Sequence, residues 1–309
     1  MKNQFKLGNL SNIGFGPYFA LIPDEYDEEL KKRIASAMAS KHLRLKSMDY
    51  TKSKYIDCLN LDNGTDDNPF SNLFTRIDAE IKCALHELYE YFDSINFVGE
   101  TISSLAVETT LHRLRNSYEC SLLLMGQMFY FETIALIRQI FEQLAYCMNI
   151  CDMTNDEFTN LSESGRKHKL RTTNIHNLKE FLTDRNIGAL YSYLSQISHI
   201  DAKQIGKFIS YDEQIKKVVV QMKSPIQVAE SALLLLGIID IHTVVLEYSL
   251  RIHLKSKYKY ITKENGQYYI SQNRKVKNLY TKYRLEFDAL LESEQNANAQ
   301  HTLYNIGGQ

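Results

Sequence analysis

Three charged side chains interrupt the apolar stretch from Met128 to Asn149, whose residue pattern predicts a helix. They are Glu132, Arg138 and Glu142. Arg138 and Glu142 are four residues apart, so on a helix they share a face and can form a planar ion pair. Two interpretations stay open. The polar residues occupy one arc, as on a solvated face, but Phe131 lies inside that arc and the helix carries no Lys, which favours a cleft.

His199 is a second candidate, at the end of a predicted helix over 187–199. Ser192, Ser195 and Gln196 precede it at spacings that place all four side chains on one helix face. A protonated imidazole in the last turn is favoured by the helix dipole, so His199 can be a capping residue. Alternatively it can act as a general base or a phosphate ligand, because histidine exchanges protons near neutral pH.

Basic residues and tyrosines are interleaved between Arg251 and Leu285, where Glu264 is the only acidic residue. Basic groups neutralise phosphates and tyrosine rings stack on bases, so this stretch is a candidate nucleic-acid surface. The residues expected to contact nucleic acid are Lys257, Tyr258, Lys259, Tyr260, Arg274, Lys275 and Lys277. The alternative is a solvated face with tyrosines packed beneath it.

The composition is that of a globular protein and favours long helices. The chain has 309 residues, is 44% hydrophobic and has a formal net charge of −1, so any affinity for nucleic acid must come from a local patch. It contains only 4 Pro and 13 Gly, the residues that break helices. Its 5 cysteines are an odd number, mostly in apolar helical surroundings, which is typical of reduced thiols in a cytoplasmic protein.

The sequence predicts no membrane span, metal site or cofactor site. Residues 1–15 lack the continuous apolar core of a secretory signal. The most apolar window, 228–245, is interrupted by Glu230, Asp240 and His242, as is typical of a buried core helix. The cysteine pairs and Cys–His pairs lack a companion pair at zinc spacing, and no Gly-rich phosphate loop occurs.

The elements that must position these residues are mainly helices. Helices are predicted over 24–42, 72–92, 102–124, 128–149, 175–183, 187–199, 226–254 and 277–291, with a short one after Thr154. Residues 1–23 are expected to be irregular, 62–69 a loop, 161–169 a basic, mobile connection and 296–309 a disordered tail.

Two β-hairpins are predicted as insertions among the helices. One lies within 206–222, and the other spans 258–270 around Asn265-Gly266, a favoured tight-turn pair. The expected fold is therefore mainly α, a multi-helix bundle with two small β-hairpin insertions. The expected divisions are an N-terminal helical region over 1–98, a helical core over 99–255, and a basic hairpin with a C-terminal helix and disordered tail over 256–309.

Two segments together resemble bacterial all-helical proteins near the HEPN superfamily. The first reads Leu136-Ile137-Arg138 with Glu142, and the second reads Tyr193-Leu194-Ser195 with His199. The resemblance covers roughly residues 100 to 250, which makes 99–255 a HEPN-like core.

The resemblance implies a function and an assembly. Many HEPN proteins are metal-independent ribonucleases of toxin–antitoxin, CRISPR or anti-phage systems, and their signature is an Arg followed four to six residues later by a His. Arg171 and His176 match that signature. In such a pair the His moves a proton of the RNA and the Arg stabilises charge on the phosphate. Family enzymes join two motifs across a dimer, so the resemblance also implies a homodimer, with an antitoxin as a further partner.

We therefore expect a cytoplasmic protein that cleaves or binds RNA without a metal, in phage defence or a toxin–antitoxin pair. The expected catalytic residues are Arg138, Glu142, His199, Arg171 and His176. The alternative is a non-catalytic helical interaction protein, in which the same Arg, Glu and His groups only hold the bundle together.

Overall fold

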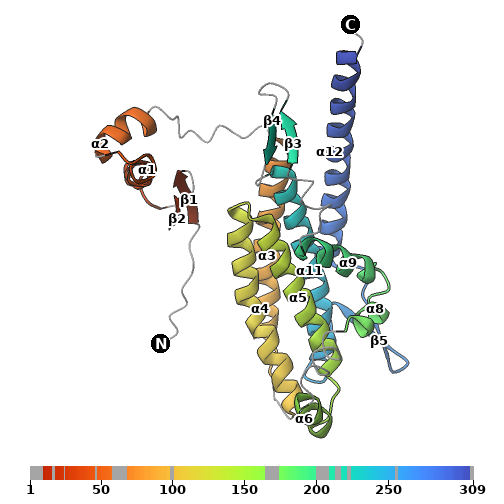
Figure 1. Cartoon of the computed structure of the whole chain (residues 1–309). Helices are drawn as coiled ribbons and strands as arrows, with labels where there is room; N and C mark the ends of the chain where they lie inside the picture. Colours follow the sequence, from red (N-terminus) through yellow and green to blue (C-terminus); the bar gives the residue numbers. More distant parts are fainter. Residues whose placement is uncertain are drawn as a thin grey trace. The chain divides into compact units, whose positions relative to one another are not determined.

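The computed structural model contains two compact units, Met1–Asp67 and Asn68–Gln309 (Figure 1). It describes residues 10–15, 18–23, 25–45, 47–57, 68–97, 101–163, 174–199, 209–212, 217–220, 224–254 and 257–306. The first unit ends before the long helix predicted over 72–92, so that helix belongs to the second unit, although the expected division at residue 98 groups it with the N-terminal region.

The first unit combines a β-hairpin with helices. Strands β1 (Leu10–Phe15) and β2 (Tyr18–Pro23) pair antiparallel, with Leu10 opposite Pro23. Helix α1 (Glu28–Leu43) and the short α2 (Met48–Thr51) follow, and α2 continues into a π-helical turn, η1 (Lys52–Ile56). The expectation that residues 1–23 are irregular is wrong for 10–15 and 18–23, because the run Tyr-Phe-Ala-Leu-Ile at 18–22 favours a strand.

Long helices lying side by side build the second unit, as Figure 1 shows. They are α3 (Pro69–Asp93), α4 (Ile102–Gly126), α5 (Tyr130–Ile150), α11 (Pro225–Ser249) and α12 (Lys275–Ile306). Helix α11 packs against the other four. The shorter helices are α6 (Asn155–Glu163), α8 (His176–Phe181) and α9 (Ile187–Ser198), of which α8 and α9 pack on α5.

Two hairpins interrupt the helices of this unit at the predicted places. Strands β3 (Ile209–Asp212) and β4 (Lys217–Val220) form one, and β5 (Ile261–Glu264) and β6 (Gln267–Ile270) form the other. At the second turn Asn265 and Gly266 have φ of 49° and 83°, the left-handed conformation that this residue pair adopts easily. The prediction of a mainly α bundle with small hairpins is confirmed.

Local sequence explains where the long helices begin. Asn68 accepts hydrogen bonds from the first backbone N–H groups of α3, and Pro69 follows it at the first helical position. Thr101 and Ser104 form a reciprocal capping box at α4. At the other end of the chain, α12 continues to Ile306, so the tail expected to be disordered over 296–309 is helical up to that residue, because α12 contains neither Gly nor Pro.

Helix α11 is the centre of the core. Among the described residues it is the one helix long and apolar enough to cross a membrane, yet 89% of its apolar window is buried within the unit. It also carries Asp240, His242 and Glu247, all buried. Each of them has a hydrogen-bond partner on another element or segment, an arrangement that suits a protein core.

Candidate active site

Arg138 and Glu142 on α5 meet His199, the residue that ends α9. Arg138 Nε donates to Glu142 Oε1 at 3.0 Å, and Arg138 Nη1 lies 2.9 Å from His199 Nε2. Arginine can only donate, so this contact requires a neutral His199 with its proton on Nδ1. The structure therefore brings together three of the expected catalytic residues, from two helices; their catalytic role stays a prediction.

Tyr191 completes this cluster from the middle of α9. Its hydroxyl donates to Glu142 Oε1 at 3.1 Å, and the Arg138 guanidinium lies over its ring, 5.6 Å from the centroid. The ring also stacks on Phe141, with centroids 5.9 Å apart. Sequence reasoning missed Tyr191. Its position eight residues before His199, about two helical turns, is the signal that could have indicated it.

The cluster is anchored but reachable from solvent. The side chains of Arg138 and Glu142 are 21% and 26% exposed, and His199 is exposed. Within the described part of the chain, Arg138 Nη2 forms no hydrogen bond, so this side of the guanidinium can bind an anion. An arginine with one free edge, beside a neutral imidazole, is an arrangement that can bind a phosphate and accept a proton.

The other expected catalytic pair is only half described. Arg171 lies outside the described residues, so the structure does not test the pairing with His176. His176 begins α8 with an exposed side chain, and its Nε2 lies 3.2 Å from Glu180 Oε1 on the next turn. Its backbone N–H donates to Asn174 Oδ1.

Most of the expected nucleic-acid-binding residues hold the β5–β6 hairpin and α12 to the bundle. Lys275 pairs with Glu87 of α3, and Lys277 pairs with Asp184 at 2.8 Å. The Lys259 ammonium lies over a tyrosine ring of α3, and Tyr258 and Tyr260 each pack edge-on against another tyrosine. Lys257 is exposed. This arrangement matches the alternative interpretation, in which tyrosines pack beneath a solvated face.

Arg274 corrects the expected nucleic-acid surface most clearly. Its side chain is 1% exposed, and it makes two hydrogen bonds to Asp240, at 2.9 and 3.0 Å. It also pairs with Asp184 at 2.9 Å. A guanidinium enclosed between two carboxylates cannot reach a phosphate at the surface, so Arg274 is a structural residue. The sequence could not show this, because its partners lie 34 and 90 residues away.

Tyr193, from the second segment of the resemblance, also connects helices. Its hydroxyl donates to Glu230 of α11, and Tyr130 of α5 donates to the same carboxylate at 2.7 Å. Burial, followed by the charge of Glu230, raises the pKa of both tyrosines well above the ordinary value. Both phenols therefore stay protonated as donors, and this cluster fixes the α5–α9–α11 contact on which the position of His199 depends.

The described residues contain no group of three His, Cys, Asp or Glu side chains that could hold a metal ion. Comparisons of the chain with protein-family models, with curated proteins and with solved structures found no match. The resemblance to HEPN proteins therefore stays a prediction, and the functional argument depends on the geometry of the Arg138 cluster.

Proposed function

We propose that this protein cleaves single-stranded RNA without a metal, at the cluster of Arg138, Glu142, Tyr191 and His199. The observation that carries the proposal is the contact between Arg138 Nη1 and His199 Nε2 at a partly exposed edge of the α5–α9 pair. Glu142 holds the guanidinium at Nε, so Nη1 and Nη2 can bind a phosphate as a fork once Nη1 leaves His199.

The chemistry follows from these positions. A phosphate of the RNA binds the guanidinium and competes for Nη1, which releases the lone pair of His199 Nε2. The imidazole then takes the proton of the 2′-hydroxyl, and the 2′-oxygen attacks the adjacent phosphorus. The P–O5′ bond breaks, O5′ takes a proton from water, and the imidazolium later returns its proton to solvent. The products are a 2′,3′-cyclic phosphate and a 5′-hydroxyl, and Arg138 stabilises the charge that builds on the phosphate.

The test is cleavage of single-stranded RNA by the purified protein in the presence of EDTA. His199→Gln keeps a hydrogen-bonding group but cannot transfer protons, so the rate should fall at least about 100-fold. His112→Gln, an exposed histidine of α4, is the matched control and should cleave at the wild-type rate. Cleavage by His199→Gln at the wild-type rate, or no cleavage by the wild type, contradicts the proposal.

The resemblance adds a setting to this proposal. HEPN enzymes act as dimers, and many work in phage defence or with an antitoxin, so we propose a homodimer in the cytoplasm with RNA as its substrate. Light scattering on the purified protein measures the oligomeric state directly.

A non-catalytic interaction protein is the second candidate, because the contacts of His199 with Arg138 and of Tyr191 with Glu142 also join α5 to α9. In that case His199→Gln should lower the free energy of unfolding and change no RNA signal. The two candidates are therefore distinguished by His199→Gln: a catalytic role predicts a lower rate of RNA cleavage, and a structural role predicts only a lower free energy of unfolding.

A further inference from the structure

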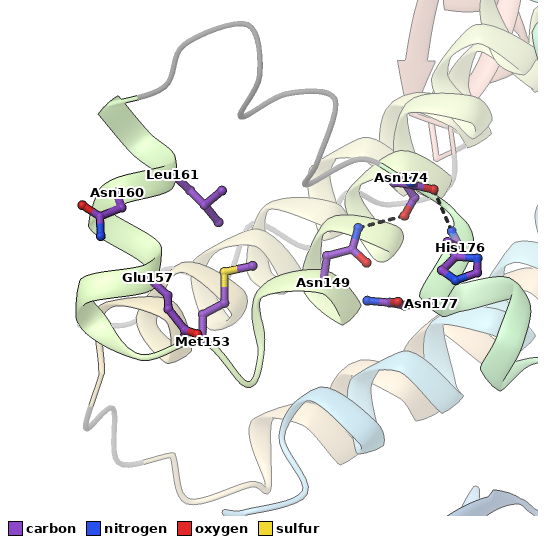
Figure 2. Close-up of a pocket in the computed structure, with 8 residues that line it drawn as sticks. All are labelled: Asn149, Met153, Glu157, Asn160, Leu161, Asn174, His176 and Asn177. Atoms are coloured by element: carbon purple, nitrogen blue, oxygen red, sulfur yellow. Dashed lines mark hydrogen bonds between the residues drawn. The ribbon is translucent and has the colours of Figure 1, made fainter.

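A pocket of about 440 Å³ lies at the C-terminal end of α5, between α6 and the start of α8 (Figure 2). Its lining residues are Asn149, Met153, Glu157, Asn160, Leu161, Asn174, His176 and Asn177. Half of them are asparagines, and none is Lys or Arg. The described lining therefore offers amides and apolar surface, together with Glu157 and His176.

Hydrogen bonds hold both walls of this pocket in place. On one side, Ile102 N donates to Asn155 Oδ1 at 2.8 Å, and Ser103 Oγ donates to the Met153 carbonyl at 2.7 Å, which ties the start of α6 to α4. On the other side, Asn149 Nδ2 donates to the Asn174 carbonyl at 2.8 Å, which ties the chain before α8 to α5. Figure 2 shows Asn149 between the two walls.

One of the amides is available to a ligand. Among the described residues, the Asn177 side chain of α8 forms no hydrogen bond, whereas the Asn160 side chain of α6 points away from the pocket in Figure 2. Leu161 and Met153 add buried and half-buried apolar surface. An amide presents a donor and an acceptor side by side, which matches the edge of a base and pairs best with adenine. Unstacked bases of single-stranded RNA expose such edges.

The pocket lies on the same face of α5 as the Arg138 cluster. Asn149 follows Arg138 by eleven residues on α5. At 100° per residue the two side chains differ in direction by only about 20° around the helix axis, and at 1.5 Å per residue they lie about 16 Å apart along it. Stacked nucleotides rise about 3.4 Å each, so a strand of a few nucleotides can connect the two places.

We propose that this pocket holds one unstacked adenine of the RNA, a few nucleotides from the phosphate at Arg138. The choice of RNA as the ligand class rests on the proposed function. Asn177 binds the edge of the base, Leu161 and Met153 contact its face, and the phosphates stay outside the pocket.

The first experiment measures binding of adenosine, guanosine, cytidine and uridine to the full chain by ligand-observed NMR. These probes carry no phosphate, so they do not depend on Arg138. Adenosine should bind best, and Asn177→Ala should weaken its binding at least tenfold. Asn116→Ala, an exposed asparagine of α4, is the matched control and should bind like the wild type.

Adenosine binding that is absent, or that is equal in wild type and Asn177→Ala, overturns the pocket proposal even if RNA is cleaved. Conversely, selective adenosine binding that Asn177→Ala abolishes upholds the pocket even if His199→Gln has no effect on RNA. Where cleavage occurs, the cut sites in the wild type should lie at a constant distance from an adenine, and Asn177→Ala should lose that preference.

Discussion

Tyr191 donates its hydroxyl to the same Glu142 oxygen that accepts from Arg138 Nε. The phenol therefore fixes the carboxylate, which in turn fixes the guanidinium, and Tyr191 touches no reacting atom. It is a positioning residue in the proposed reaction, and its ring also makes a cation–π contact with the Arg138 guanidinium.

Tyr191→Phe separates positioning from folding, because it removes only the hydroxyl. The cleavage rate should fall about tenfold through loss of orientation. The free energy of unfolding should fall by about 1 kcal/mol, the usual contribution of one hydrogen bond. Rate measurements and urea unfolding of the same preparation give both quantities. A rate equal to that of the wild type would mean that Glu142 needs no help from the phenol.

His242 makes the stability of the second unit depend on pH. It is fully buried against Tyr118, whose hydroxyl lies 3.2 Å from Nδ1, and its Nε2 has no partner among the described residues. Burial lowers the pKa of His242 to about 3, from the ordinary 6.5. Below pH 6.5 His242 therefore binds a proton in the unfolded chain but stays neutral in the folded chain. Its contribution to the free energy of unfolding is full above that pH and is lost as the pH falls towards 3.

His242→Gln should remove this dependence. Between pH 7 and pH 5 the free energy of unfolding of the wild type should fall by about 2 kcal/mol more than that of His242→Gln. Urea unfolding at each pH measures the difference. His86→Gln, at an exposed histidine of α3, is the control and should keep the wild-type slope. Equal slopes in wild type and His242→Gln would show that another group causes the acid loss.

At the scale of elements, one carboxylate of α11 holds the segment that leads into the β5–β6 hairpin. Glu247 is fully buried and accepts hydrogen bonds from the backbone N–H groups of Lys259, Tyr260 and Ile261 at 2.6, 2.7 and 2.9 Å. Tyr91 of α3 also donates its hydroxyl to it, at 2.6 Å. Four donors on one charged acceptor explain why a Glu can stand in the most apolar helix.

Glu247→Ala would leave these buried donors without an acceptor, so we expect a loss of about 3–5 kcal/mol in the free energy of unfolding. Hydrogen exchange of the three amides should also become much faster. Glu247→Gln keeps one acceptor oxygen and should lose less, which keeps the test informative if the Ala variant does not fold. Glu264→Ala, exposed on β5, should change stability by no more than about 0.5 kcal/mol.

At the scale of the whole second unit, Asp240 joins three distant parts of the chain. It accepts from Arg274 at the start of α12 and from Arg185 between α8 and α9, at 2.9 and 2.6 Å. Asp184 accepts from Arg274 and Lys277. This network locks α12 and the α8–α9 connection onto α11, and through α9 it supports the position of His199.

Arg274→Met tests whether this residue is structural. Removing one partner of a buried pair should cost about 3–5 kcal/mol of unfolding free energy. Lys275→Met, at an exposed pair, should cost at most about 1 kcal/mol. Thermal and urea unfolding provide the comparison. A stable Arg274→Met protein with weakened RNA binding would restore the nucleic-acid role that the burial of Arg274 argues against.

Local patterns predicted most of the elements of the second unit. The spacing of apolar residues, the capping residues and the Asn265-Gly266 turn act between near neighbours in the chain, so they predicted the long helices and both hairpins of the second unit. The predictions were wrong at the first hairpin, where they overlook the strand preference of residues 18–22, and at the C-terminal end of α12, where they interpret a polar composition as disorder.

The sequence by itself determined that α5 carries Arg138 and Glu142 on one face and that His199 ends a helix. Only the tertiary structure decided that α9 packs on α5, bringing His199 to Arg138, and that Arg274 is buried between two carboxylates. The physical reason is that the residue type of a charged side chain does not indicate whether its partner is water or a carboxylate ninety residues away. Packing of the helices makes that choice, and no local spacing encodes it.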